Sequence, residues 1–151
     1  MGGKSFRSQK NNWSCGILSI QNSIRALNCD ADYDDIKRLS RANSKDGTST
    51  RGVLRALRAL GFNAVYYKTR NAENAIRFAR KWATLQPLII SCDSDTHWAT
   101  ITGSVNDMLI LVDSGLDASG EDKGVYPLAR QQLLERWLCR GWYKAIRVSR
   151  M

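Results

Sequence analysis

The sequence has little histidine, little proline and no long apolar segment. Its 151 residues include one histidine and two prolines, and no apolar run approaches the ~20 residues needed to span a bilayer. The four cysteines, at positions 15, 29, 92 and 139, are far apart and form no Cys-x-x-Cys pair. Zinc sites usually combine such pairs with histidines. A zinc site with the usual ligand spacing is therefore not expected.

The N-terminal segment lacks the apolar core of a signal peptide, because it begins Met-Gly-Gly-Lys-Ser-Phe-Arg-Ser. Nothing else in the sequence indicates secretion, so we expect reduced thiols rather than disulfides. A cytoplasmic protein is the prediction.

The composition is that of an ordinary globular protein, with 43% hydrophobic and 25% charged residues. The length fits a single domain over residues 1–151, with an irregular arm at residues 1–8. Lys and Arg number 23 against 14 Asp and Glu, which gives a net charge of +9. Such a charge raises the hypothesis of nucleic-acid binding. The basic residues are scattered, mostly along the polar faces of predicted helices, so we favour a basic protein with another task.

The hydrophobic pattern predicts helices first and an antiparallel sheet afterwards, which is an α+β arrangement. Apolar residues at spacings of three and four predict helices, and short apolar or aromatic runs predict strands. The predicted helices span about 15–28, 33–43, 51–60, 71–85 and 127–138, with Thr50 capping the third and Pro127 in the first turn of the last. The predicted strands span 62–68, 87–92, 97–103, 108–113 and 142–148, with a hairpin through 104–107 and a loop at 114–125.

Cys15 and Gly16 open the first predicted helix, with Ser14 as its N-cap. The partial positive charge of a helix N-terminus favours a thiolate over a thiol. Gly16 removes a side chain where a substrate backbone would approach, and Gln9 can return its amide group to the same place. On its own, Cys15 is more often a small buried core residue.

The predicted hairpin brings the only histidine close to a carboxylate. His97 begins one strand and Asp113 ends the other, so the two side chains become neighbours. A cysteine nucleophile needs a base within reach and a third group that fixes the tautomer of that base. Singly, His97 fits a loop-edge histidine and Asp113 a turn residue. The ordered set, with each member at an element boundary, favours a catalytic site.

These residues resemble the pattern of the papain-like bacteriocin-processing peptidases, also called double-glycine peptidases. That pattern has a Gln, a Cys-Gly that opens a helix, a helix ending in Leu-Gly, a Pro before an apolar strand, a His-aromatic strand and a strand ending in Asp-Pro. In this chain Ser114 stands in place of the usual proline. The chain supplies Gln9, Cys15-Gly16, Leu60-Gly61-Phe62, Pro87-Leu88-Ile89, His97-Trp98 and Asp113-Ser114-Gly115.

The resemblance implies a papain-like fold, in which an N-terminal helical half packs on an antiparallel sheet, and the activity of a cysteine peptidase. Cys15 would be the nucleophile, His97 the base and Asp113 its orienting partner. Gln9 and the Cys15 backbone N–H would bind the oxyanion. The substrate would be a peptide or protein, with a Gly-Gly or isopeptide bond as a candidate target.

Gly16 and Trp98 are the candidate substrate-binding residues, and no metal or organic cofactor is required. Two other interpretations compete with the peptidase. One is a catalytically inactive peptidase-fold module that binds a peptide or partner protein. The other is a basic nucleic-acid-binding domain, which depends on net charge alone.

Overall fold

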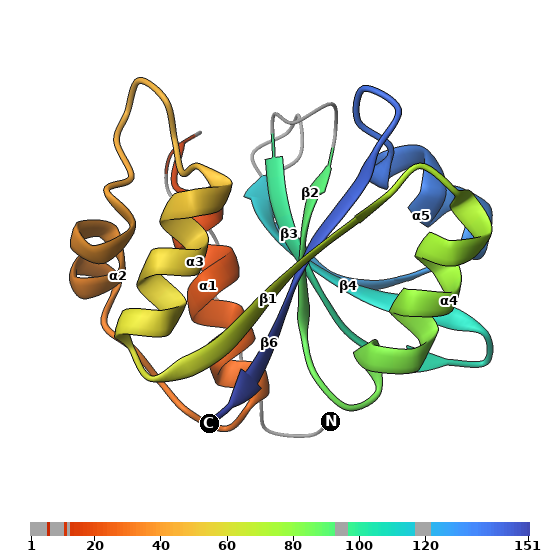
Figure 1. The fold of residues 1–151 in the computed structure, drawn as a ribbon, viewed down its shortest axis with the longest axis horizontal. Coiled ribbons are helices and arrows are strands. Elements are labelled where there is room, and N and C mark those ends of the chain that lie inside the picture. Colours follow the sequence, from red (N-terminus) through yellow and green to blue (C-terminus); the bar gives the residue numbers. More distant parts are fainter. Residues whose placement is uncertain (1–5, 7–10, 12, 93–96, 117–121) are drawn as a thin grey trace.

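The computed structural model describes residues 6, 11, 13–92, 97–116 and 122–151, and this part of the chain folds as helices packed on an antiparallel sheet (Figure 1). This is the predicted α+β class. The elements in chain order are α1 (Cys15–Ala26), α2 (Tyr33–Ser40), α3 (Thr50–Ala59), β1 (Phe62–Thr69), α4 (Ala72–Ala83), β2 (Leu88–Cys92), β3 (His97–Val105), β4 (Met108–Leu116), β5 (Asp122–Leu128), α5 (Arg130–Trp137) and β6 (Tyr143–Arg150).

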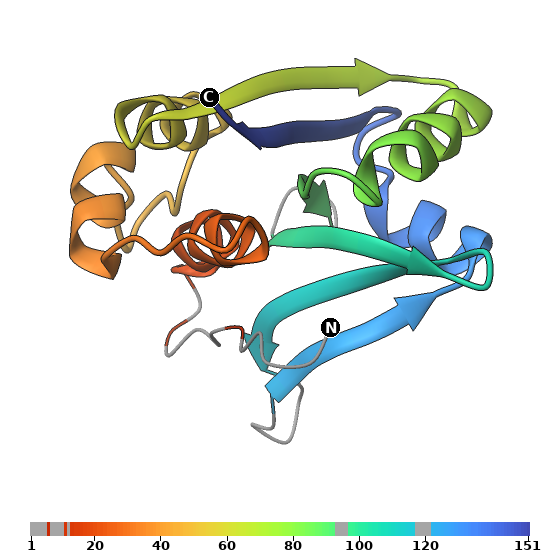
Figure 2. The same ribbon diagram turned by 90° about the horizontal axis from the view of Figure 1, so that it is seen from below.

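The sheet has six strands in the order β1-β6-β2-β3-β4-β5, and every neighbouring pair is antiparallel. The last strand, β6, lies between β1 and β2. It therefore joins the early helical part of the chain to the β2–β5 part, as the two strands β1 and β6 in Figure 2 show. A long-range pairing of this kind makes the two halves of the fold depend on each other.

Two apolar cores form, one on each face of the sheet. Helices α1, α2 and α3 cover one face, and α4 and α5 cover the other (Figure 1). Strand β2 contributes to both cores, because successive strand residues point to opposite faces. Leu88 and Ile90 belong to the α4–α5 core and Ile89 belongs to the α1–α3 core, and all three are fully buried. This is why β2 reads as a continuous apolar run rather than an alternating one.

The helix starts follow side-chain capping, with one correction. The caps Asp32 and Asn71 accept backbone N–H groups of the first turns of α2 and α4. The cap of α3 is Ser49, whose Oγ accepts the Gly52 N–H at 3.0 Å. Thr50 was the wrong residue by one position, because Ser49 has the extended backbone of an N-cap and Thr50 is already helical.

The hairpin between β3 and β4 turns through two residues, Asn106 and Asp107, and not through four as predicted. Both residues have positive φ, 50° and 66°. Asn and Asp tolerate this backbone region better than other non-glycine residues, and tight hairpins need it at both central positions. The shorter turn leaves β3 longer than the sequence pattern indicated, whereas β4 begins at Met108 as predicted.

The region after Asp113 was predicted wrongly. Instead of a loop over 114–125 and a helix from Pro127, β4 continues to Leu116, β5 covers Asp122–Leu128 and α5 begins at Arg130. Pro127 lies in β5 and pairs with Ile110. Because β5 is an edge strand of the sheet, a residue without an N–H group is tolerated there.

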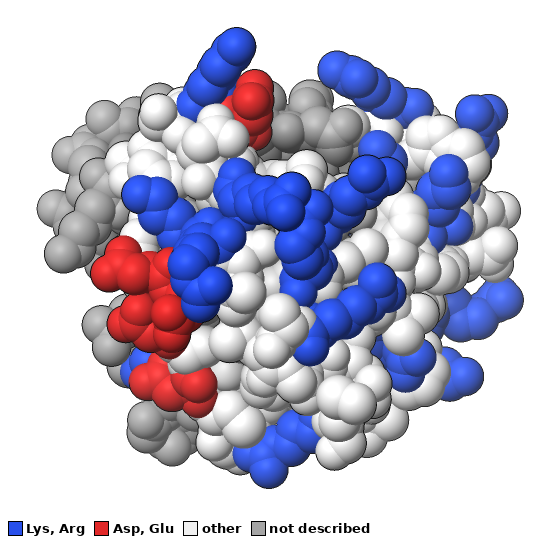
Figure 3. All heavy atoms as spheres, turned by 60° about the vertical axis from the view of Figure 1, so that its left-hand side comes forward, with Lys and Arg blue, Asp and Glu red and all other residues white. Residues whose placement is uncertain are grey.

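The surface over α3, β1 and β6 is basic. Strand β1 pairs with β6, and none of the three elements contains Asp or Glu. Their basic residues are Arg51, Arg55, Arg58, Lys68, Lys144, Arg147 and Arg150. Figure 3 shows Lys and Arg in a band across one face, with acidic side chains grouped at one side. The basic residues are thus more clustered than the expected scatter along helices. Among the helices of the described residues, none has the length and apolarity to cross a membrane.

Gly52 allows α2 and α3 to pack closely, and its substitution tests the helical half of the fold. A Cβ at Gly52 would lie 2.4 Å from the carbonyl oxygen of Ser40, which belongs to the backbone. We expect Gly52→Ala to lower the free energy of unfolding by about 1–3 kcal/mol through overpacking, although alanine alone favours a helix by ~1 kcal/mol. Urea unfolding followed by circular dichroism measures the change.

Gly103→Ala is the matched control, because a Cβ there meets no atom within 4 Å. Its free energy of unfolding should stay within about 0.5 kcal/mol of the parent value. Equal stability of the two variants would show that the α2–α3 contact is not tight.

Candidate active site

Cys15 is the first residue of α1, and its side chain is largely buried, at 6% exposure. Ser14 occupies the N-cap position, and its carbonyl accepts the Leu18 N–H at 3.0 Å. Its hydroxyl makes no capping bond to the helix. The prediction of Ser14 as the N-cap is therefore right in position but not in side-chain chemistry. The N–H groups of a first helical turn have no intrahelical partner, so they are available to bind an anion.

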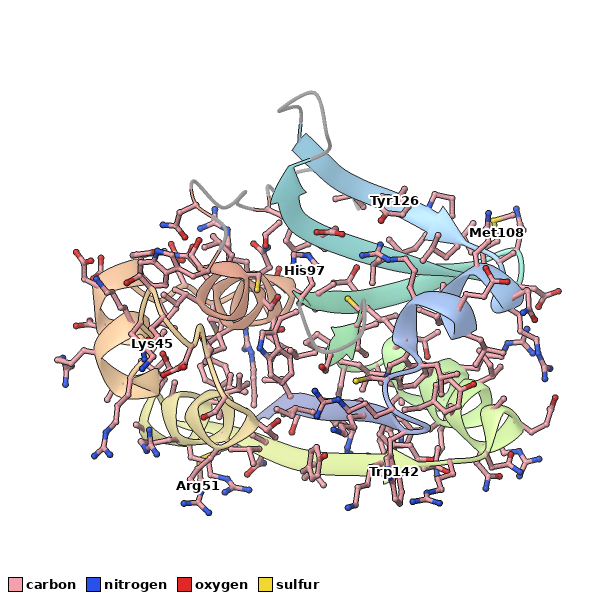
Figure 4. The ribbon with its side chains drawn as sticks, turned by 90° about the horizontal axis from the view of Figure 1, so that it is seen from above. Lys45, Arg51, His97, Met108, Tyr126 and Trp142 are labelled. Carbon is pink, nitrogen blue, oxygen red and sulfur yellow. The ribbon has the colours of Figure 1, made fainter. Side chains whose placement is uncertain are left out.

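A buried hydrogen bond holds α1 against β3. Thr100 Oγ1 donates to the carbonyl of Ser19 at 3.2 Å, and Ser19 lies one turn after Cys15 on the same side of the helix. This contact brings the head of α1 beside the start of β3. His97 lies there, within side-chain hydrogen-bond reach of Cys15. Figure 4 shows His97 between α1 and the strands β3 and β4.

Asp113 holds the other side of the imidazole. The His97 Nε2 atom lies 2.6 Å from Asp113 Oδ1, which also accepts the Gly115 N–H at 2.8 Å. Since Nε2 is engaged by the carboxylate, Nδ1 is the ring nitrogen left for Cys15. The structure therefore brings together Cys15, His97 and Asp113, three parts of the chain that are distant in sequence.

The position of Asp113 differs in detail from the prediction, because it lies inside β4 and not at its end. The β3–β4 pairing shifts between Ile101 and Gly103, which moves the start of β3 relative to its partner strand. Gly115 therefore lies next to the His97 imidazole. A Cβ on Gly115 would lie 3.1 Å from Asp113 Oδ1 and 3.2 Å from His97 Cε1, so a larger residue would crowd the ring.

The electrostatics of this group favour an imidazolium beside an ionised carboxylate. Burial opposes protonation of His97, but hydrogen bonds and charge interactions with Asp113 and Cys15 outweigh it and raise the pKa of His97 to about 9. Burial also works against the ionised form of Asp113. The hydrogen bond and charge of His97, the Gly115 N–H and Arg136 nevertheless hold the pKa of Asp113 well below its usual range. Both groups are charged at neutral pH.

Arg136 is a site residue that the sequence analysis did not identify. Its Nη2 donates to Asp113 Oδ2 at 2.9 Å, on the opposite side of the carboxylate from His97. A signal was present, since residues 133, 136 and 137 share one side of a helix and Leu133 and Trp137 are fully buried. An arginine in the apolar stripe of a helix indicates a buried acidic partner.

Gly16 and Trp98 lie beside Cys15, joined through Thr48. A Cβ on Gly16 would fall 2.5 Å from the Thr48 side chain and 3.2 Å from Trp98 Cδ1. The Trp98 indole Nε1 donates to the Thr48 carbonyl at 2.9 Å. Close packing thus gives a structural reason for a glycine at position 16, and the role of both residues in substrate binding stays a prediction. Gln9 lies outside the described residues.

The model of the peptidase C39 family matches residues 4–138. The chain belongs to this family. No curated protein matches the chain in sequence. Solved structures of C39 peptidase domains share its fold, as predicted from the papain-like resemblance.

Three of these structures span nearly the whole chain. The peptidase domain of Streptococcus ComA, a bifunctional ABC transporter involved in quorum sensing, is 19% identical with a TM-score of 0.74, covering 99% of this chain and 100% of that one. A double-glycine-motif protease from an AMS/PCAT transporter, solved with the leader peptide, is 17% identical with a TM-score of 0.75, covering 97% and 91%. A C39-like peptidase from Bacillus anthracis is 13% identical with a TM-score of 0.63, covering 99% and 96%.

The protonation state of His97 is directly measurable, because it is the only histidine in the sequence. In untagged protein, we expect the imidazole carbon-bound proton to titrate by NMR with a midpoint near pH 9, against an ordinary value of 6.5. Asp113→Asn should lower the midpoint most and Cys15→Ala less, because each variant removes a negative partner of the imidazolium. A midpoint near 6.5 in the parent protein would show that no ion pair forms.

Proposed function

We propose that the chain is a cysteine peptidase that uses Cys15 as nucleophile, His97 as general acid and base, and Asp113 as the residue that orients His97. The observation that carries the proposal is the hydrogen bond of 2.6 Å between His97 and the buried Asp113 carboxylate, with Cys15 close enough to the imidazole to help raise its pKa. A nucleophile, a base within reach and an orienting third group are the arrangement that covalent acyl transfer requires. Family membership supports the same reaction class.

In the first step, the Cys15 thiolate attacks the carbonyl carbon of the scissile peptide bond. Negative charge then develops on the carbonyl oxygen. The backbone N–H of Cys15, at the unpaired start of α1, and the side-chain amide of Gln9 are the proposed donors to this oxyanion. Because Nε2 of His97 is engaged by Asp113, Nδ1 is the proposed donor that protonates the leaving amine as the carbon–nitrogen bond breaks.

In the second step, water hydrolyses the thioester that remains on Cys15. Neutral His97 takes a proton from the water, the oxygen attacks the thioester carbon, and the sulfur leaves as thiolate beside the regenerated imidazolium. The hydrogen bond from Nε2 to Asp113 keeps the ring oriented through both steps. These steps use side chains, backbone N–H groups and water only.

The proposed substrate is a peptide or protein, and a bond that follows Gly-Gly is the first candidate. The AMS/PCAT structure is that of a double-glycine-motif protease with a leader peptide, which supports this choice by analogy. The decisive experiment is cleavage of a peptide library, read by mass spectrometry, with Ala-Ala peptides as the comparison. Binding of Gly-Gly peptides without turnover would favour the inactive peptide-binding module instead.

Thiol labelling separates activation from exposure. Cys29 is partly exposed, whereas Cys15, Cys92 and Cys139 are buried at 6%, 0% and 1% exposure. Exposure alone therefore predicts that Cys29 reacts first. At pH 6 an ordinary thiol with a pKa near 8.5 is only about 0.3% thiolate, so an ion-paired Cys15 should react with iodoacetamide at least about tenfold faster than Cys29.

His97→Ala should reverse this order, because it removes the imidazolium that stabilises the thiolate and leaves Cys15 the less exposed thiol. Peptide mapping of the labelled protein gives both rates. Labelling of Cys29 ahead of Cys15 in the parent protein would contradict an activated nucleophile.

Gln9 is tested by two substitutions with different chemistry. Gln9→Ala removes the proposed oxyanion donor, and Gln9→Glu keeps the side-chain size but removes both N–H groups. Each should lower kcat on a cleaved peptide by about 100- to 1000-fold, the usual cost of one lost oxyanion donor. Cys15→Ala sets the background rate. Turnover at the parent rate in both Gln9 variants would remove Gln9 from the mechanism.

A further inference from the structure

We infer that Arg136 is a positioning residue of this site: its guanidinium holds the Asp113 carboxylate in the orientation that binds His97. The inference deepens the proposed peptidase function and rests on it for its kinetic consequences. Its geometric part, the effect of Arg136 on the His97–Asp113 hydrogen bond, is measurable without any substrate.

The two oxygens of Asp113 have different partners. Oδ1 lies 2.6 Å from His97 Nε2 and accepts the Gly115 N–H at 2.8 Å. Oδ2 accepts Arg136 Nη2 at 2.9 Å. A carboxylate rotates about its last carbon–carbon bond, so a charged donor on Oδ2 fixes the direction of Oδ1. Arg136 therefore sets the plane in which the imidazole is held.

Arg136 is itself anchored on more than one side. Its Nη1 donates to the Tyr126 hydroxyl of β5, and its Nη2 lies 3.9 Å from the Cys92 sulfur of β2. The planar fork of a guanidinium is suited to such divided contacts, which a lysine ammonium cannot reproduce. Helix α5 thus connects to β2, β4 and β5 through one side chain.

Burial makes this contact strong. The Asp113 side chain is fully buried and that of Arg136 is 21% exposed, so water screens the pair weakly. Within the part of the chain that the structure describes, titratable or charged groups around the carboxylate and its partners include His97 from β3, Arg136 from α5, Tyr126 from β5, Cys92 from β2 and Cys15 from α1. Arg136 is the member of this group that carries a fixed positive charge.

The primary test is Arg136→Gln, compared with Arg130→Gln as a matched control. Arg130 lies on the same helix and pairs with Glu73, away from Asp113. We expect Arg136→Gln to lower kcat/KM by about 10- to 100-fold, the effect of one lost hydrogen bond to a charged group. Arg130→Gln should match the parent enzyme.

The NMR signal of His97 distinguishes a positioning role from a merely structural one, because a merely structural role would leave this signal unchanged. The Nε2 proton shared with Asp113 should resonate far downfield in the parent protein, and this signal should weaken or move upfield in Arg136→Gln. The His97 titration midpoint should fall, because a displaced carboxylate stabilises the imidazolium less. If Arg136→Gln acted only by removing a positive charge near His97, the titration midpoint of His97 would instead rise.

Arg136→Lys keeps the charge and one donor, and it should recover part of both the rate and the NMR signal. If Arg136→Gln does not fold, Tyr126→Phe provides the milder version, since it removes only the hydroxyl that Arg136 contacts, and its change should have the same direction. The inference would be overturned if Arg136→Gln raised the titration midpoint of His97 and left its downfield Nε2 proton signal unchanged. Where Tyr126→Phe is used instead, an unchanged midpoint and an unchanged signal would overturn it. If neither the parent protein nor any variant cleaved a peptide, the peptidase proposal would be rejected. The NMR result would still decide the role of Arg136.

Discussion

The buried carboxylate of Asp113 is the constraint on which the site depends. An ionised carboxylate is stable in a buried position only when it is paired and hydrogen-bonded. Three of its hydrogen-bond partners are His97 at the start of β3, the backbone of Gly115 in β4, and Arg136 on α5. The Gly115 N–H is a local contact within β4, whereas His97 reaches Asp113 only when β3 pairs with β4, and Arg136 only when α5 packs on the sheet. The two charged contacts of Asp113 therefore depend on the folded arrangement.

The sheet decides how these partners meet. Strands β2, β3 and β4 lie in its interior, with α1 packed on one face and α5 on the other. Cys15 belongs to the helical layer of α1–α3 and Arg136 to the layer of α4 and α5. Both lie close to residues of the β3–β4 hairpin. The hydrogen bond between Thr100 and Ser19 holds α1 against β3, and the bond between Arg136 and Asp113 holds α5 against β4. The site lies at the start of β3, with Cys15 of α1 on one side and Arg136 of α5 on the other.

The sequence was informative where chemistry and periodicity agree. Apolar spacing located α1, so Cys15 was placed correctly at its first turn, and two apolar runs predicted the hairpin that joins His97 to Asp113. The sequence-based prediction was wrong where the amino-acid composition suggested turns. Residues 114–125 are rich in Gly, Asp and Ser, yet β4 and β5 extend into them, because pairing with a neighbouring strand outweighs local preference. Arg136 was missed because nothing local reveals that its partner lies on β4.

The charges alternate from the His97 imidazolium to the Asp113 carboxylate to the Arg136 guanidinium. Burial of the Asp113 carboxylate favours its protonated form, and neighbouring cations oppose that effect. Arg136 adds a permanently positive charge next to the carboxylate rather than next to Cys15. A cation at that end stabilises Asp113 without competing with His97 for Cys15, so the imidazolium remains the acid nearest to the sulfur. In the proposed mechanism, this separation lets a proton move between His97 and a reacting group while the carboxylate stays ionised.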